Sequence, residues 1–359
     1  MDRRTIEVYE RESERYESRR TPRHRAAARA LGRRVGAGPV VDLGCGPGWY
    51  SSSLGSPVVA LDAAMAMLRR TREVAPRALL VRADLGALPF RRGALRGAWA
   101  RNTYVHVRSV DVPMALGDLH AALEVGALVE LTFFGGDVEG RAVFPDDDLP
   151  GRWFSTWSEQ RLRDVVVGAG FEVDELARRE RGGEVGFTVR ARRVRTLADT
   201  VGPALRLLVC GLNPSLRAAD AGIGFVTPGN RFWPAALAAG AVTRDRAPTW
   251  ALRLDGVGMT DLVKRATSRA DGLAPHEYRD GLARVERLCA WLQPGAVCVV
   301  GLAGWRAAVD RRAVPGWQER DVGGRPVYVM PSTSGANARA QLPALIEHLR
   351  TALAPPRTL

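Results

Sequence analysis

The sequence predicts an α/β protein of two domains, each built on a parallel sheet between layers of helices. Short runs rich in Val and Leu alternate with longer amphipathic segments, which is the pattern of parallel strands joined by crossover helices. This pattern stops near residues 190–204 and then starts again. A chain of 359 residues also exceeds the usual size of one hydrophobic core.

The apolar runs give the expected strands in chain order. In the first half they cover residues 38–43, 57–62, 78–84, 96–102, 127–134, 170–176 and 184–194. In the second half they cover residues 205–213, 296–302 and 325–332. We therefore expect one domain at 1–195 and another at 204–359, joined by a linker at 196–203, with each domain folded as three αβα layers.

Composition excludes several classes of protein. The formal net charge of +13 comes almost entirely from arginine and is shared by both halves, so nucleic-acid binding has to be argued from particular sites. The charged first twenty residues contain no secretory signal, and the uncharged segment 288–305 is interrupted by Pro294 and Gly295, so no membrane span is expected. No C-x-x-C pair joins the cysteines, which argues against a disulfide framework or a bound metal and favours a cytoplasmic protein. The cysteines are Cys45, Cys210, Cys289 and Cys298.

A glycine-rich loop follows the first expected strand. In residues 40–50, VVDLGCGPGWY, the strand ends at Asp42, and alternating glycines then let the backbone turn tightly beside a ligand. Asp62 closes the next strand, where a carboxylate can accept hydrogen bonds from both hydroxyls of a ribose. Asp84 closes the third strand in the same way. These residues indicate a nucleotide-like cofactor.

Residues 1–195 resemble a class I S-adenosylmethionine-dependent methyltransferase on the strength of this loop and these acids. The resemblance implies a Rossmann-like sheet of seven strands, with S-adenosylmethionine as cofactor and no metal. Asp62 would hold the ribose, and Asp84 would face the adenine amine. The resemblance assigns these residues to the cofactor: Asp42, Gly44, Cys45, Gly46, Gly48, Asp62, Asp84 and Leu85. A Rossmann-like domain that binds another nucleotide, or none, is the alternative.

The methyl acceptor is not indicated by any motif. The Asn/Asp-Pro-Pro-Tyr motif of amino-group DNA methyltransferases does not follow the fourth expected strand, and no cysteine follows a proline as a nucleophile. Tyr104 and His106 come after that strand and are the candidates for the acceptor side. Tyr9 and Tyr16 lie in an amphipathic segment similar to the family's lid helix. A small molecule and a nucleic acid both remain open as acceptors.

The second half places a different set of residues after its first strand. In LLVCGLNPS, Asn213 lies just past the carboxyl end of a buried strand, where open α/β sheets bind ligands. Its amide can orient a water molecule without acting as a strong base. Phe225 can supply a flat apolar wall. Residues 328–339, YVMPSTSGANAR, give a turn of small residues suited to contact with phosphate and backbone.

Residues 204–353 resemble the mismatch-specific uracil-DNA glycosylases, the family that includes thymine-DNA glycosylase. The family motif Gly-Ile-Asn-Pro-Gly is matched from Gly211 to Ser215, and the second motif by Pro331 to Ala338. The resemblance implies that Asn213 positions the attacking water. It also implies a base pocket made of Leu212, Phe225 and Ser332, and DNA contacts by Ser334, Gly335, Ala336, Asn337 and Arg339.

The combined expectation is a bifunctional enzyme acting on DNA that contains uracil or a mismatch. The glycosylase would flip uracil out of the duplex, most easily where pairing is poor. Ser215 replaces the motif's last glycine, and Ala336 stands where the family inserts a larger side chain into the base stack. One alternative is a lapsed glycosylase that serves the methyltransferase as a nucleic-acid-binding module. Another is a small-molecule methyltransferase with an incidental fusion.

Overall fold

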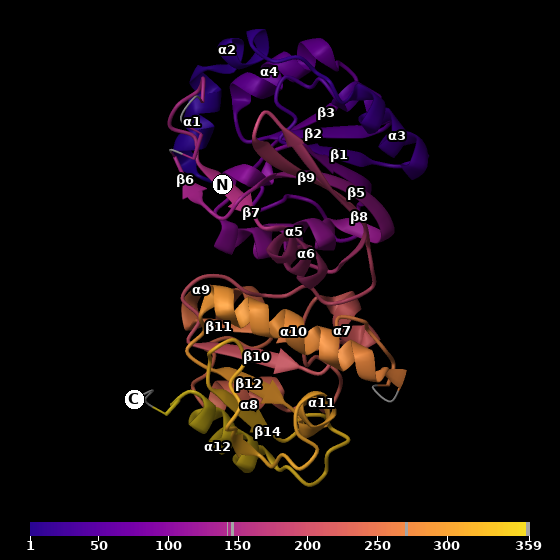
Figure 1. Cartoon of the computed structure of the whole chain (residues 1–359). Helices are drawn as coiled ribbons and strands as arrows, with labels where there is room; N and C mark the ends of the chain where they lie inside the picture. The colour runs from indigo at the N-terminus through magenta and orange to yellow at the C-terminus, as the bar shows by residue number, and fades with distance from the viewer. Residues whose placement is uncertain (142, 145–146, 270–271, 357–359) are drawn as a thin grey trace. The chain divides into compact units, whose positions relative to one another are not determined.

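The computed structural model describes residues 1–141, 143–144, 147–269 and 272–356, which form two compact units (Figure 1). The first unit contains Met1–Val167 and Phe171–Val194, and the second contains Gly168–Gly170 and the chain from Arg195 onward. Each unit has its own sheet, as the sequence predicts. Among the described helices, none is both long and apolar enough to cross a lipid bilayer.

The first unit is built around a long, mostly parallel sheet. Its helices are α1 (Arg3–Arg11), α2 (Ser13–Ser18), α3 (Arg25–Val35), α4 (Met65–Val74), α5 (Val112–Ala122) and α6 (Glu159–Gly168), with short 3₁₀ turns at Ser51–Ser53, Tyr104–His106 and Ser109–Asp111. Its strands are β1 (Val40–Leu43), β2 (Val58–Asp62), β3 (Leu79–Arg82), β4 (Leu95–Ala100), β5 (Leu123–Gly135), β6 (Glu139–Gly140), β7 (Phe154–Trp157), β8 (Phe171–Arg181) and β9 (Glu184–Arg193).

The strand order puts the glycine-rich loop in the middle of this sheet. Strands β3-β2-β1-β4-β5 are parallel neighbours, and β9 then pairs antiparallel with both β5 and β8. These strands make up the expected sheet of seven. The short strands β7 and β6 extend it beyond the end of β5. Strand β1 is buried along its whole length because it has a neighbour on each side, which explains its apolar sequence.

The second unit is a smaller sheet of the same class. Its strands are β10 (Leu207–Gly211), β11 (Val257–Asp261), β12 (Val297–Val300), β13 (Gly316–Trp317) and β14 (Val327–Met330). Its helices are α7 (Leu216–Ala221), α8 (Phe232–Ala238), α9 (Pro248–Asp255), α10 (Pro275–Leu292), α11 (Leu302–Ala308) and α12 (Leu342–Ala352). The sheet order is β11-β10-β12-β14-β13, and only the pair β13 and β14 is antiparallel. Phe232 and Trp233 of α8 lie in its core, each 1% exposed.

Two parts of the second unit differ from the expectation. Strands β11 and β13 were not among the expected strands. Strand β11 pairs with β10 and sets Asp261 opposite Gly211, and the short β13 pairs antiparallel with β14. Residues 196–203, expected as a linker, pack within the unit. Asp199 is 4% exposed, and Thr200 exchanges two backbone hydrogen bonds of 2.8 Å with Met259 of β11. This segment therefore supports the edge of the sheet that carries Asp261.

Candidate functional site

The first unit has a cavity at the carboxyl ends of its central strands. Four of the residues expected to bind a cofactor line it: Gly44, Gly46, Asp62 and Leu85. Tyr9 and Tyr16 line the same cavity from the two N-terminal helices. The cavity therefore lies where the edge of an open α/β sheet binds ligands, with the tyrosine-bearing helices beside it.

Two glycines of the loop are required for different reasons. Both have left-handed backbones, with φ of 61° at Gly44 and 54° at Gly46. A Cβ on Gly44 would lie 2.1 Å from Cγ2 of Thr103, so this glycine allows close packing inside the protein. A Cβ on Gly46 would make only an ordinary contact, with Cε1 of Tyr16 at 3.9 Å. Gly46 therefore brings no side chain to the wall of the cavity.

Asp62 presents a carboxylate to this cavity at the end of β2. Its oxygens accept hydrogen bonds from the N–H groups of Gly46, at 3.0 Å, and Ala64, at 2.9 Å. Burial raises the pKa of Asp62 to about 6 despite these bonds. Each carboxylate oxygen can accept more than one hydrogen bond, so the group can also bind hydroxyls of a ligand.

Three other residues of the predicted cofactor set shape the loop without lining the cavity. Asp42 is 2% exposed and accepts a 2.7 Å hydrogen bond from Oγ of Ser51, and burial raises its pKa to about 7. Burial also raises the pKa of the Cys45 thiol well above its usual range, so this cysteine is an unreactive thiol. Gly48 packs against Thr71, whose Cγ2 would lie 2.7 Å from an added Cβ.

The fourth is Asp84, whose carboxylate is bound by Met1, a residue that lines the cavity. It accepts hydrogen bonds from the amino group of Met1, at 2.7 Å, and from the N–H of Gly86, at 2.8 Å. Its sequence neighbours Ala83 and Leu85 line the cavity, but Asp84 does not. The structure thus directs this acid to the start of the chain.

The two residues expected on the acceptor side have different positions. Tyr104 is 1% exposed, does not line the cavity beside the glycine loop, and stacks on Phe133 with ring centroids 6.3 Å apart. The expectation for Tyr104 is therefore corrected: it is a core residue, because the 3₁₀ turn at 104–106 directs its ring inward. His106 does line the cavity, and burial lowers its pKa to about 4.

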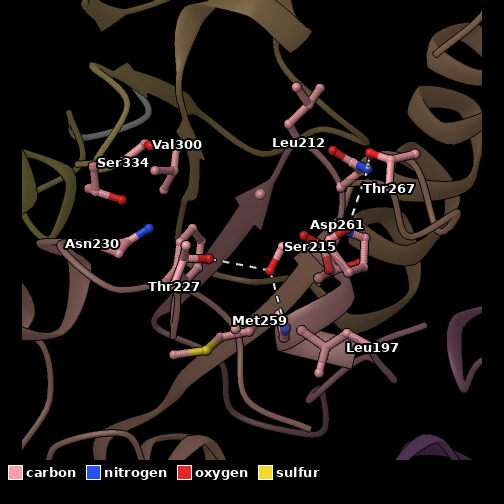
Figure 2. Close-up of a pocket in the computed structure, with 18 of the residues that line it drawn as sticks. Leu197, Leu212, Ser215, Thr227, Asn230, Met259, Asp261, Thr267, Val300 and Ser334 are labelled. Atoms are coloured by element: carbon pink, nitrogen blue, oxygen red, sulfur yellow. Dashed lines mark hydrogen bonds between the residues drawn. The ribbon is translucent and has the colours of Figure 1, made fainter. Parts of the chain in front are cut away.

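The second unit has a cavity of about 270 Å³ where strands β10, β11, β12 and β14 end. Five predicted site residues line it: Leu212, Asn213, Phe225, Ser332 and Ser334. In Figure 2, Asn230 and Ser334 lie across the pocket from Asp261 and Thr267. The cavity therefore has two facing walls, and a flat ligand could enter the space between them.

The side chain of Asn213 is held in one orientation by hydrogen bonds from its amide nitrogen. Its Nδ2 donates to Oγ1 of Thr267, at 2.7 Å, and to the carbonyl of Arg265, at 3.0 Å. The Oδ1 atom is thereby left as the polar end that can orient a water molecule. Ser215, the replacement for the motif's last glycine, has φ of −70° and caps α7, with Oγ accepting from the N–H of Ala218 at 3.1 Å. That position does not require a glycine.

Phe225 has a strained backbone and one buried ring face. Its φ of 57° is in the left-handed region, which is costly for a side chain of this size. The ring stacks on Phe232 with centroids 4.2 Å apart and an interplanar angle of 24°. Because Phe225 also lines the cavity, it can offer a flat ring surface to a ligand.

Asp261 is a site residue that the sequence motifs did not single out, although it lies in the segment 258–267, GMTDLVKRAT, which resembles a family segment lining the active-site side. It is 7% exposed, lines the cavity at the end of β11, and is the one acid among the described residues lining it. The charged groups facing it are Lys264, Asp199 and Arg284. Burial outweighs the two cations and raises the pKa of Asp261 to about 6. A Cβ on Gly211 would lie 2.4 Å from Oδ1 of Asp261 and 3.5 Å from Cζ of Phe225, so the carboxylate and the ring are neighbours.

The remaining predicted DNA contacts lie between Gly335 and Arg339, in the part of the loop 332–340 that does not line the cavity. Gly335, Ala336 and Arg339 are exposed, whereas the Asn337 side chain donates to the carbonyl of Ser332 at 2.9 Å. Arg231 holds this loop in place, a role for Arg231 that the sequence did not indicate. Its guanidinium donates to the carbonyls of Ser334, Asn337 and Ala340 at 2.9, 2.7 and 2.6 Å. Within the described residues, no cluster of His, Cys, Asp or Glu is arranged to hold a metal ion.

Comparison with known families assigns a class to each unit. Residues 198–354 match the family model of the uracil DNA glycosylase superfamily. Residues 40–126 match the model of a methyltransferase domain. The chain therefore contains a methyltransferase domain followed by a domain of the uracil-DNA glycosylase superfamily, as the sequence motifs predict.

Solved structures similar to this chain include several methyltransferases. One is an S-adenosylmethionine-dependent methyltransferase from Methanosarcina mazei, with 18% identity and a TM-score of 0.40 over 44% of this chain and 92% of that one. Another is the magnesium protoporphyrin IX methyltransferase of Synechocystis, with 15% identity and a TM-score of 0.41 over 52% and 97%. A third is the 1,6-didemethyltoxoflavin-N1-methyltransferase of Burkholderia thailandensis, with 18% identity and a TM-score of 0.41 over 53% and 88%.

Proposed function

We propose that the second unit is a DNA glycosylase that hydrolyses the N-glycosidic bond of uracil in a U:G mismatch, or that of a related damaged base. We propose further that the first unit is a methyltransferase that uses S-adenosylmethionine. The observation that carries the first proposal is the meeting of Asn213, Phe225 and Asp261 around one cavity. A pocket that served only to hold DNA would not need an oriented amide and a buried acid together.

The proposed reaction begins with a base flipped out of the helix, because the glycosidic bond is out of reach inside a duplex. The flipped base stacks on Phe225. Oδ1 of Asn213 orients a water molecule toward C1′ of the deoxyribose. As the new C1′–O bond forms, Asp261 accepts a proton from that water, and the C1′–N1 bond breaks with its electron pair leaving on the base.

The departing base carries negative charge, and this pocket offers polar groups on its far wall to stabilise it. Ser332, Thr333 and Ser334 line the cavity from the loop after β14, and Asn230 lies on the same side as Ser334 (Figure 2). Neutral donors of this kind stabilise an anion without the cost of burying a cation. The proposal therefore divides the cavity into a side that activates water and a side that receives the leaving base.

The loop 332–340 is the proposed contact with the DNA backbone. Its exposed tip at Gly335 and Ala336 carries little side chain, and only Arg339 adds a positive charge there. A small side chain fills the space left by a flipped base poorly. We therefore expect excision to be fastest where pairing is already weak, as in a mismatch or a single strand.

The first cavity fits S-adenosylmethionine in two respects. Gly46 lines the cavity without a side chain, and Asp62 lines it with a carboxylate, as recognition of ribose hydroxyls requires. When bound, the cofactor supplies a methyl group on a positively charged sulfur. The residues of this chain orient it, and Tyr9 and Tyr16 exclude water from that side of the cavity.

The glycosylase is tested by alkali cleavage of labelled oligonucleotides. The substrates carry U opposite G, U opposite A, T opposite G, or U in a single strand, and the proteins compared are the wild type and Asn213→Ala. We expect cleavage at U opposite G, reduced by on the order of 100-fold in the variant because the attacking water loses its orientation. Asn102→Ala, in the first unit, is the matched control and should cleave like the wild type. Binding of these oligonucleotides without any cleavage would identify the unit as a targeting module instead.

A further inference from the structure

The first unit has a second cavity next to the proposed cofactor site. This cavity, of about 570 Å³, shares four lining residues with the first one: Tyr9, Tyr16, Asn102 and His106. Its size falls within the range of about 300–1,000 Å³ that is usual for small-molecule sites. A compound held there would meet the cofactor cavity across this shared wall.

Aromatic rings make up much of the cavity's lining. Phe134 and Phe144 meet edge to face with centroids 5.0 Å apart, and Phe144 and Phe154 do the same at 4.9 Å. His106 adds its ring 4.9 Å from that of Phe154. All four residues line the cavity. Such surfaces favour a flat aromatic ligand, which can add further edge-to-face or stacked contacts.

The charges of the lining balance one another. The arginines Arg19, Arg20 and Arg152 are matched by the acids Asp147, Asp148 and Glu184. Two of these pairs are direct contacts: Arg20 donates to Asp148 at 2.8 Å, and Arg152 forms an ion pair with Asp147 inside the protein. A protein that binds a nucleic-acid strand needs an excess of positive side chains facing the phosphates of that strand. The lining of this cavity has no such excess.

A chain of hydrogen bonds fixes the polar groups on the shared wall. Arg152 can only donate, and it does so to the Tyr9 hydroxyl at 2.8 Å. The Tyr9 hydroxyl therefore donates to Nε2 of His106, at 2.8 Å, and Nδ1 of His106 donates to the carbonyl of Trp153 at 2.7 Å. This arrangement requires a neutral imidazole, in agreement with the low pKa that burial gives His106.

The same wall offers a donor as well as an acceptor. Oδ1 of Asn102 accepts a 2.7 Å hydrogen bond from Oγ1 of Thr132, which leaves the Nδ2 group of Asn102 as the donor for a ligand. The Tyr9 oxygen can accept a further hydrogen bond. A hydroxyl group both donates and accepts through one atom, so a single hydroxyl can satisfy Tyr9 and Asn102 together.

We infer that this second cavity binds the methyl acceptor, and that the acceptor is a small planar aromatic compound bearing a hydroxyl group. Its ring lies among Phe134, Phe144 and Phe154, and its hydroxyl points to the wall shared with the cofactor cavity. The inference rests on the proposed methyltransferase function, since it concerns the acceptor of that activity. It excludes a nucleic-acid strand as the substrate of this unit.

The test uses the full-length protein and 2-naphthol as the probe. Binding of S-adenosylhomocysteine is first measured by calorimetry, and binding of 2-naphthol is then measured by saturation-transfer NMR with S-adenosylhomocysteine in excess. We expect 2-naphthol to bind, cyclohexanol not to bind, and a single-stranded oligonucleotide not to displace 2-naphthol. Phe134→Ala should weaken 2-naphthol binding by at least about tenfold, because it removes a half-buried ring from the cavity.

Two further variants show which cavity binds 2-naphthol and whether a loss of binding is due to misfolding. Phe225→Ala removes a ring from the cavity of the other unit and should leave 2-naphthol binding unchanged. Phe144→Ala repeats the test of Phe134→Ala with a different residue, and calorimetry with S-adenosylhomocysteine reports whether each variant is folded. Loss of 2-naphthol binding in Phe225→Ala alone, or displacement by the oligonucleotide, would overturn the inference.

The arms also separate this inference from the proposed function. If S-adenosylhomocysteine binds and 2-naphthol does not, the acceptor class is wrong and the methyltransferase proposal stands. If neither ligand binds, both fail. Equal binding of cyclohexanol and 2-naphthol would contradict the requirement for an aromatic ring.

Discussion

Asp261 is the residue on which the chemistry of the second unit depends most directly. A carboxylic acid with an ordinary pKa is a weak base at neutral pH, and burial raises the pKa of this one to about 6. Lys264 and Arg284 act against that rise, so the group stays ionised at pH 7. An ionised acid beside the ring of Phe225 is suited to take a proton from water attacking the sugar of a stacked base.

The first prediction concerns Asp261→Asn. An asparagine cannot accept the proton, so we expect uracil release to fall by about 10²-fold or more. In the wild type the base must be ionised, and the rate should therefore decline as the pH falls below about 6, whereas the residual rate of the variant should lack that limb. Single-turnover rates across this range measure both effects, and Asp245→Asn, at an exposed position, is the control. A rate that rises as the pH falls would show that Asp261 acts as an acid.

The second prediction concerns Asp62 in the first unit. Ribose hydroxyls donate hydrogen bonds most strongly to the ionised carboxylate, and the pKa of Asp62 is about 6. The affinity for S-adenosylhomocysteine should therefore fall as the pH drops below about 6. Asp62→Asn should weaken binding by on the order of 10- to 100-fold at pH 7 and remove this pH dependence, as titration calorimetry would measure. A wild-type affinity that stays constant from pH 7 to pH 5 would contradict the proposed contact.

At the scale of elements, the sequence predicted the strands better than the residues between them. Each of the ten apolar runs overlaps an observed strand, and the buried parallel strands among them are predictable because they require continuous apolar sequence. Strand β11 was missed because Val257–Asp261 is short and contains a glycine and two polar residues. Without this strand Asp261 could not be singled out, since its place beside Gly211 follows from the register of β10 with β11.

Long-range contacts explain the other differences between sequence and structure. The glycine loop, Asp62, Asn213 and Phe225 were predictable because local motifs carry them. The capture of Asp84 by the Met1 amino group and the clamp formed by Arg231 were not, because their partners are far away in the chain. Local sequence cannot specify such pairs.

The third prediction concerns Arg231, the positioning residue for the loop 332–340. One guanidinium holds three carbonyls of this loop, a geometry that a single ammonium group cannot reproduce. Arg231→Lys and Arg231→Ala should therefore both increase hydrogen exchange in the loop and raise KM for U:G duplexes by about tenfold or more, with a smaller effect on kcat. Arg253→Ala, on the exposed side of α9, should change neither. A loss of kcat at unchanged KM would argue against a role in holding DNA.

At the scale of the whole molecule, each unit carries its own sheet, core and cavity. Asp199 is the buried anchor of the second unit. Its carboxylate binds Lys264 at 2.8 Å and Arg284 at 2.7 Å, and these cations hold its pKa below the usual range. The ionised Asp199 therefore stabilises the folded second unit at pH values above the pKa that an aspartate has in the unfolded chain. This stabilisation is lost as the pH falls below about 4.

The last prediction uses these separate cores in calorimetric unfolding. Asp199→Asn removes the buried carboxylate that Lys264 and Arg284 both contact, which should lower the free energy of unfolding of the second unit by about 3–5 kcal/mol. Saturating S-adenosylhomocysteine should stabilise the first unit by about 2.7 kcal/mol at 100 times its Kd, because it binds only the folded state. If the units unfold separately, the substitution should lower the melting temperature of one transition and the ligand should raise that of the other. Each change should leave the second transition where it was in the wild type. A common shift of both transitions would mean that the units unfold together, and that a ligand in one cavity stabilises the other.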